Sequence, residues 1–158
     1  MEKDFVFQRK IRKVNLIGQV LLKKNLINPE QLEAALNIQR VEGGLLGNIL
    51  VSKGFISEES FTIALSSQLD LAYIPIEKYN VSKEAIKMVS RDLADKYCFF
   101  PLEKIGSVLI LSCVDPLNVR AITEVETAAN CQVVPIIGMR SEIEKAINTY
   151  MAYRNDKP

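Results

Sequence analysis

The chain carries one pattern of apolar and polar positions twice. Residues 16–39, LIGQVLLKKNLINPEQLEAALNIQ, align without a gap on residues 45–68, LLGNILVSKGFISEESFTIALSSQ, at an offset of 29 positions. The two copies share a glycine near the start, the spacing of the apolar residues and the final glutamine. A repeat of this length is typical of one supersecondary unit used twice.

Each copy begins with a segment that predicts a short helix and a turn. Residues 16–24 and 45–53 place apolar side chains three and four positions apart, as on one face of a helix. Asn25 and Gly54 then share one repeat position. These two residue types best tolerate the left-handed backbone that commonly ends a helix.

A second helix follows in each copy. Asn28 and Ser57 are favourable N-caps, and Pro29 suits the first position of a helix. The apolar side chains beyond them recur at i, i+3 and i+4 and share one face with a glutamine at i+7. These residues are Leu32, Ala35, Leu36 and Gln39 in the first copy and Phe61, Ala64, Leu65 and Gln68 in the second.

Two repeated features of this pattern have both a structural and a functional interpretation. Glycine within a helix costs roughly 0.5–1 kcal/mol relative to alanine. Its repetition at Gly18 and Gly47 indicates close backbone approach by a partner helix or by a ligand. Gln39 and Gln68 are either ordinary helix-end residues or share a hydrogen-bonding role, whereas the leucines and Phe61 are most simply core.

The second half of the chain predicts a small sheet with helices. Residues 98–104 and 108–114 read as two strands, and Pro101 places the first at a sheet edge. A helix at 117–129 then leads to a strand at 131–137. A capping box at Ser141–Glu144 opens a last helix with Ile143, Ala146, Ile147 and Tyr150 inward. Asp115 is interpreted as a turn residue and helix cap rather than a catalytic group.

These elements predict an α+β fold of the α/β-sandwich type. A hairpin precedes a strand–helix–strand unit whose strands run parallel with a right-handed connection. The organisation expected is a basic flexible arm at 1–14, a helical tandem-repeat subdomain at 15–69, a connector at 70–80, an α/β subdomain at 81–152 and a tail at 153–158.

The composition of the chain argues against most kinds of enzyme active site. The chain has no histidine, three cysteines without CxxC spacing and a net charge of +1. No G-x-x-x-x-G-K-[ST] loop is present to cradle a nucleotide phosphate. The second helices carry acidic residues in their first turns. A helix that recognises DNA would present groups there that bind bases and phosphates. We therefore expect a non-enzymatic, cytoplasmic protein without metal or nucleic acid, in which the cysteines are reduced.

The doubled pattern resembles the N-terminal domain of the ATPases that drive type II secretion and type IV pilus assembly. The ligand-binding version of that domain, MshEN, has two 24-residue motifs that each begin with R-L-G and end with glutamine. Gly18, Gln39, Gly47 and Gln68 match these landmarks. Pro101, Asp115–Pro116 and Tyr150 match landmarks of the family's second half. The resemblance implies a regulatory or docking domain whose candidate ligand is cyclic di-GMP.

Both motif arginines are missing, because Leu16 and Leu45 occupy their positions. An arginine fork can bond O6 and N7 of guanine together, a contact worth about 1–3 kcal/mol. The alternative that this departure favours is a module that docks a secretion or pilus ATPase core to its membrane-platform protein without nucleotide, peripheral to the membrane through its partners. The resemblance assigns the candidate ligand site to Ile17, Gly18, Leu21, Leu22, Leu32, Leu36, Gln39, Leu46, Gly47, Leu50, Val51, Leu65 and Gln68.

Overall fold

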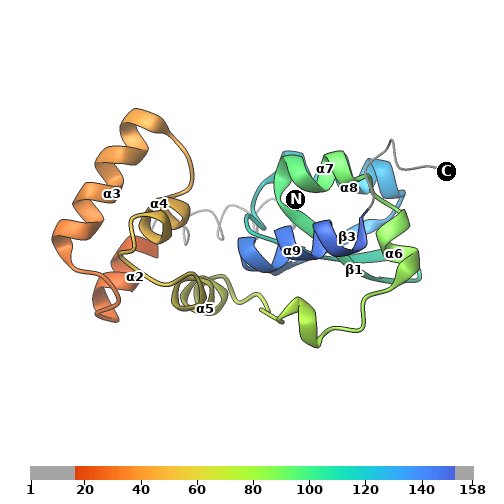
Figure 1. Cartoon of the computed structure of the whole chain (residues 1–158), viewed down its shortest axis with the longest axis horizontal. Helices are drawn as coiled ribbons and strands as arrows, with labels where there is room; N and C mark the ends of the chain where they lie inside the picture. Colours follow the sequence, from red (N-terminus) through yellow and green to blue (C-terminus); the bar gives the residue numbers. More distant parts are fainter. Residues whose placement is uncertain (1–16, 152–158) are drawn as a thin grey trace, which may run out of the picture. The chain divides into compact units, whose positions relative to one another are not determined.

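The computed structural model describes residues 17–151 and divides into two compact units, residues 1–70 and 71–158 (Figure 1). The expected arm at 1–14, the tail at 153–158 and Leu16 lie outside the described residues. As the sequence pattern predicts, helices come first and a three-stranded mixed sheet follows, which confirms the α+β class.

Unit 1 consists of two helix pairs over its described residues. The first pair is α2 (Ile17–Lys23) and α3 (Pro29–Glu42), and the second is α4 (Leu46–Ser52) and α5 (Glu58–Leu69). The pairs interlock, because α3 contacts α4 and α2 contacts α5. Gly43 and Gly44 link the pairs with φ of 76° and 90°, a left-handed conformation that favours glycine.

The turn inside each pair has the same hydrogen bonds at the 29-residue offset. Asn25 and Gly54 have φ of 55° and 69°. Each turn carries the two bonds of a Schellman motif, which satisfies carbonyls at the helix end. In the first repeat, the Asn25 amide donates to Leu22 O and the Leu26 amide donates to Leu21 O. In the second repeat, the Gly54 amide donates to Val51 O and the Phe55 amide donates to Leu50 O. All four bonds measure 2.9 Å.

The N-caps of the second helices also correspond. The amide of Gln31 donates to Asn28 Oδ1 at 2.8 Å, and the Gln31 side chain accepts from the Asn28 amide, which completes a capping box. Ser57 Oγ accepts from the Ser60 amide at 3.1 Å. The two repeats therefore end their first helices with the same turn and begin their second helices with the same N-cap bond, as the sequence alignment predicts.

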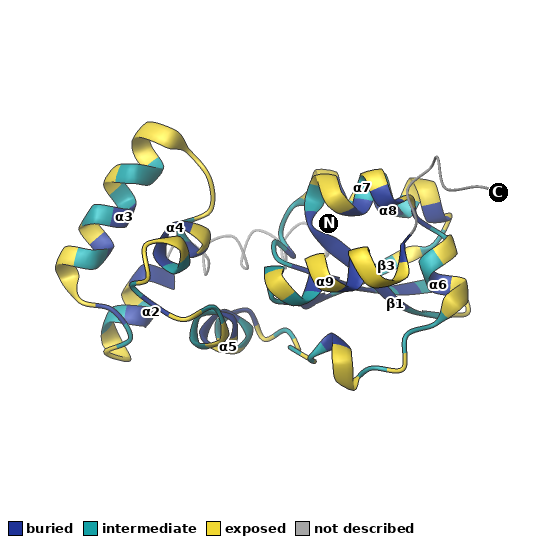
Figure 2. Cartoon of the chain, in the orientation of Figure 1, coloured by how far each residue is buried: buried dark blue, intermediate teal, exposed yellow. Residues whose placement is uncertain are grey.

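Unit 2 is built on the sheet β1 (Phe99–Ile105), β2 (Val108–Cys113) and β3 (Gln132–Ile137), in the order β1-β2-β3. β1 pairs antiparallel with β2, and β2 pairs parallel with β3. The helices are α6 (Lys83–Lys87), α7 (Arg91–Tyr97), α8 (Val119–Ala129) and α9 (Arg140–Tyr150), preceded by the 3-10 turn η1 (Ile76–Lys78). Figure 2 shows buried positions along β1 and helices whose outer faces are exposed.

Three local expectations for unit 2 are wrong. α9 begins at Arg140 after Met139, which makes no side-chain cap, so Ser141 lies inside the helix and opens no capping box. Tyr150 is 54% exposed rather than inward. Asn118, not Asp115, caps α8 through a bond from the Ala121 amide at 3.0 Å.

Residues 71–80, expected as a connector, are integrated into unit 2. Ile76 is 5% exposed and belongs to the core beneath the sheet. The amide of Ile137 in β3 donates to Ala72 O at 2.8 Å. Tyr79 Oη donates to Glu103 Oε2 at 2.6 Å. This segment therefore pairs and packs with the α/β elements.

The outer edge of β3 offers no amide donor to another strand. The Gln132 amide bonds Ser107 O on the β2 side, so alternate amides at 133, 135 and 137 face outward. Val133 N–H donates to Glu126 Oε1 at 3.0 Å, Pro135 has no N–H, and Ile137 N–H bonds Ala72 O. An edge without available donors is protected from strand addition.

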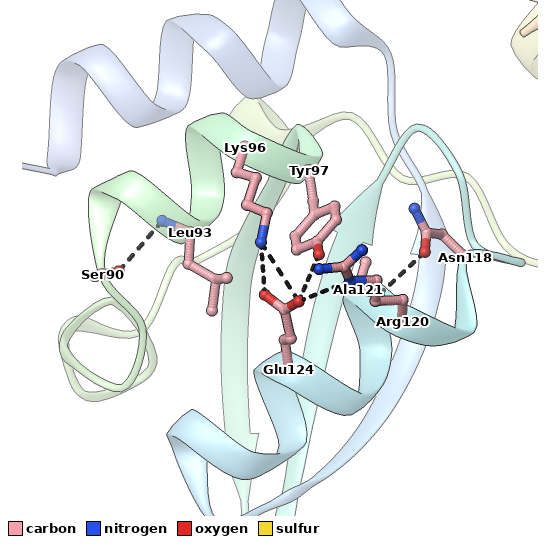
Figure 3. Close-up of polar contacts among 8 residues, drawn as sticks. All are labelled: Ser90, Leu93, Lys96, Tyr97, Asn118, Arg120, Ala121 and Glu124. Carbon is pink, nitrogen blue, oxygen red and sulfur yellow. Dashed lines mark hydrogen bonds and ion pairs between the residues drawn. The ribbon is translucent and has the colours of Figure 1, made fainter. Parts of the chain in front are cut away.

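Two polar clusters hold the helices of unit 2 together. Glu124 on α8 accepts from Lys96, Tyr97 and Arg120, with Tyr97 Oη at 2.7 Å (Figure 3). These contacts lower the pKa of Glu124 to about 2, with the hydrogen bond from Tyr97 as the largest cause. Arg91, with a side chain 8% exposed, donates to the Met151 carbonyl at 2.7 Å and also bonds Asn148.

Candidate ligand site in the helical repeats

The thirteen residues of the candidate site divide into a buried group and a half-buried group. The buried group is Ile17, Gly18, Leu21, Leu32, Gly47, Leu50 and Leu65. These residues are part of the buried interior of unit 1, which agrees with the structural interpretation of the pattern. The half-buried group is Leu22, Leu36, Gln39, Leu46, Val51 and Gln68. Only this second group presents side-chain atoms that a ligand could contact directly.

The two glycines are explained by packing within each repeat. A Cβ on Gly18 would lie 2.8 Å from Leu32 Cδ1, and one on Gly47 would lie 2.2 Å from Phe61 Cζ. Leu32 and Phe61 occupy the same repeat position. The close approach predicted at both glycines is therefore made by a side chain of the second helix. The structure gives no need for a ligand to account for it.

The two glutamines, equivalent in sequence, have different surroundings. Gln39 Nε2 donates to Gly44 O at 2.9 Å and so fastens the end of α3 to the link between the repeats. Gln68 Oε1 is buried and has no hydrogen-bond partner. The predicted hydrogen bond is thus made within the chain by Gln39, whereas Gln68 Oε1 has no partner among the described residues.

Leu45 stands where the second motif has arginine. It is the N-cap residue of α4, has an extended backbone and makes no side-chain cap. Its side chain is 40% exposed. A long side chain at this position would start from the protein surface beside Leu46 and Gly47. Leu16, the corresponding residue of the first repeat, is outside the described part of the chain.

Elsewhere the described residues provide little reactive chemistry. Burial raises the pKa of Asp115, whose Oδ1 accepts from the Leu117 amide at 3.3 Å in the turn after β2. Burial also raises the pKa of the Cys113 thiol far above its usual range, which makes that thiol unreactive. Within residues 17–151, no cluster of three or more metal-binding side chains occurs, and no helix has the length and apolarity to cross a membrane.

Sequence comparison connects the chain with one domain family. The profile of the MshEN domain matches residues 69–156, more than half of the chain. This match lies almost wholly in unit 2. Unit 1, which contains the repeated motif, is reached by the longer pairwise comparisons.

Two curated relatives are named for different processes, pilus assembly and bacteriophage adsorption. The type IV pilus assembly ATPase PilB of Myxococcus xanthus is 29% identical over 136 residues, 86% of this chain and 24% of that protein. Bacteriophage adsorption protein B of Escherichia coli is 30% identical over 146 residues, 90% of this chain and 19% of that protein. The chain therefore spans a quarter or less of the length of these relatives.

Solved structures share the fold over both units. MshE with cdg, the abbreviation for cyclic di-GMP, superposes with a TM-score of 0.73 at 24% identity, over 85% of this chain and 97% of that one. The N-terminal domain of XpsE superposes with a TM-score of 0.75 at 22% identity, over 89% and 96% of the two chains. At these identities the likeness establishes the fold alone.

Proposed function

Because the chain belongs to the MshEN domain family, we propose that it is a non-catalytic regulatory module whose ligand is cyclic di-GMP. The observation that carries the proposal is the pair of helix-pair repeats, which keep the same turn and cap hydrogen bonds at a constant offset. The half-buried leucines, valine and glutamines of those repeats would form the contact surface. MshE, which shares this fold, has been solved with cdg.

The names of the relatives support a portable role. A pilus assembly ATPase and a bacteriophage adsorption protein both contain a segment similar to this chain. A segment shared by proteins with such different names is better suited to sensing one ligand than to fitting one machine. On this proposal, the catalytic activity of any larger assembly resides outside this chain.

The missing arginines set the expected strength of binding. Without a guanidinium at 45, the second repeat lacks the fork that bonds the outer edge of guanine. Stacking on apolar side chains and hydrogen bonds to glutamine would remain. By analogy with base readout, each missing fork weakens binding by about 1–3 kcal/mol, or roughly 5- to 150-fold.

A docking module is the second candidate, and exposed apolar side chains of unit 1 favour it. Val41 is 85% exposed, Ile63 53% and Leu45 40%. Burying such side chains against another protein would remove apolar surface from water, which favours association. The partner would be a secretion or pilus ATPase core or a membrane-platform protein.

Calorimetric titration of the whole chain with cyclic di-GMP separates these functions. The parent should bind weakly, and Leu45→Arg should tighten binding roughly 5- to 150-fold. Ile63→Arg is the matched control, since it adds the same charge at an exposed position of the same repeat that is not a candidate ligand-site residue. If neither the parent nor Leu45→Arg binds, the ligand proposal fails and the docking module becomes the better account.

A further inference from the structure

We propose that unit 2 pairs with a second copy of this chain through an apolar patch on its sheet. This open patch consists of Ile105, Val108, Ile110 and Val134, which come from all three strands. The proposal goes beyond the proposed function, because it concerns unit 2 and does not depend on the ligand of unit 1. The contact is isologous, which means that each copy presents the same four residues to the other.

The strand register brings these four side chains together on one face of the sheet. Ile105 is paired with Val108 across β1 and β2, and Ile110 is paired with Val134 across β2 and β3. Directly opposed residues point to the same face, and so do residues two apart along a strand, as Val108 and Ile110 are. The open patch is therefore continuous across the sheet.

Helix α9 covers only one end of this face. A Cβ on Gly138 would meet both Ser112 Oγ and the Ile143 side chain of α9, so the buried Ser112 lies beside that helix. Further along the same face, Val134 is 47% exposed and Ile105 is 56% exposed. The other two residues of the open patch are half-buried. Apolar side chains thus reach solvent where α9 no longer covers the strands.

The surroundings of the open patch favour a second copy as its occupant. Along the sheet, its solvent-accessible neighbours are the hairpin turn at Gly106 and Ser107, Gln132 and Glu103. Among these residues only Glu103 carries a charge, and Tyr79 Oη donates to its Oε2 at 2.6 Å. Charged groups across an interface mainly select the partner and exclude wrong ones. An apolar patch with this rim meets an identical patch with little like-charge repulsion.

The fold also restricts how the two copies meet. The outer edge of β3 has no available amide donor, so a second sheet cannot extend this one there. The copies would instead pack face to face, with their sheets about 10 Å apart. A stable interface usually covers about 800 Å² on each partner, and four partly exposed side chains supply only the centre of such an area. The dimer is therefore weak and depends on protein concentration.

Sedimentation velocity of the whole chain over a range of protein concentrations tests this proposal. The parent should change reversibly from monomer to dimer as the concentration rises. Val134→Glu should weaken dimerisation by about tenfold or more, because it places like charges in one interface. Ile105→Glu is a second variant of the open patch and should act in the same way. Val119→Glu is the matched control, since that residue is 50% exposed on α8, outside the open patch.

Urea unfolding accompanies the test, and all three variants should keep the parent's midpoint because each position is exposed. If the parent stays monomeric at every concentration, the proposal is wrong. A dimer that is equally strong in Val134→Glu and Ile105→Glu would place the interface elsewhere and overturn it. Equal weakening by Val119→Glu would assign the effect to charge rather than to the open patch. Cyclic di-GMP is absent from these measurements, so this inference and the proposed function fail separately.

Discussion

Gly47 faces the ring of Phe61 so closely that a Cβ at Gly47 would lie 2.2 Å from Cζ and 2.3 Å from Cε1. The corresponding pair, Gly18 and Leu32, is less tight, with the Cβ 2.8 Å from the end of a flexible leucine side chain. A glycine on the first helix of each repeat contacts a side chain on the second helix. Only in the second repeat is that side chain a rigid aromatic ring.

Gly47→Ala should therefore destabilise the chain by about 1–3 kcal/mol, as overpacking commonly does, and Gly18→Ala by less. Urea unfolding of both variants measures the difference. Phe61→Leu in the Gly47→Ala background gives the alanine–leucine pair that Gly18→Ala gives in the first repeat, and should recover part of the loss. Equal effects of the two alanine variants, or no recovery, would show that the ring does not set the spacing.

Replacing Arg91 should loosen the end of α9. Its guanidinium donates to Met151 O and bonds Asn148, and Arg91→Met would leave the buried Met151 carbonyl without that donor. We expect a loss of roughly 1–3 kcal/mol in the free energy of unfolding. Arg120→Met is the control, because that side chain is 79% exposed and its ion pair should contribute no more than about 0.5 kcal/mol. Similar losses in both variants would contradict the assignment.

Alkaline pH should weaken unit 2 through Tyr79. The hydrogen bond to Glu103, then burial and the charge of Glu103, raise the Tyr79 pKa from 10.0 to about 12. A raised folded-state pKa contributes stability that is complete below pH 10 and is lost as the pH rises through about 12.

Tyr79→Phe tests this linkage. The variant should be less stable than the parent at neutral pH. The difference between their free energies of unfolding should become smaller as the pH rises from 10.0 to about 12. The measurement is the unfolding midpoint in urea at several pH values. Glu103→Gln is the companion variant, since it keeps an acceptor and removes the charge. A gap that stays constant through the window would contradict the role of the tyrosine proton.

The protected edge of β3 predicts an effect on association. Pro135→Val would create an outward-facing N–H between Val133 and Ile137, whose amides are already bonded. We expect more self-association, measured by sedimentation velocity over a range of protein concentrations. Val134→Ile is the control because it adds apolar area on the same strand without adding a donor. Identical behaviour of the two variants would mean that the proline is not what protects the edge.

Local chemistry explains which features were predictable from sequence. The repeat could be identified because Asn25, Gly54, Asn28 and Ser57 each favour one backbone conformation or cap without help from distant residues. Gln39 and Gln68 could not be distinguished in this way. After Gln39 the chain turns back through Gly43 and brings Gly44 O to its amide.

After Gln68, by contrast, α5 ends at Leu69 with Asp70 in a left-handed conformation. The carbonyl that Gln39 finds after its own helix therefore has no counterpart in the second repeat. The two glutamines occupy the same motif position but have different surroundings, because the chain that follows each of them differs. The sequence also places the start of α9 wrongly, because the helix begins after Met139, which is extended and makes no side-chain cap that a capping-box pattern could reveal.

The boundary at Asp70 has a consequence for how the family diverges. The profile that identifies the chain as a family member begins at residue 69, so it covers unit 2 and almost none of the repeats. Substitutions such as arginine to leucine at position 45 leave that signature untouched. The family match therefore rests on unit 2, while the candidate ligand-site residues all lie in unit 1. A good match to this profile is therefore no measure of how well the repeats keep the residues of the ligand motif.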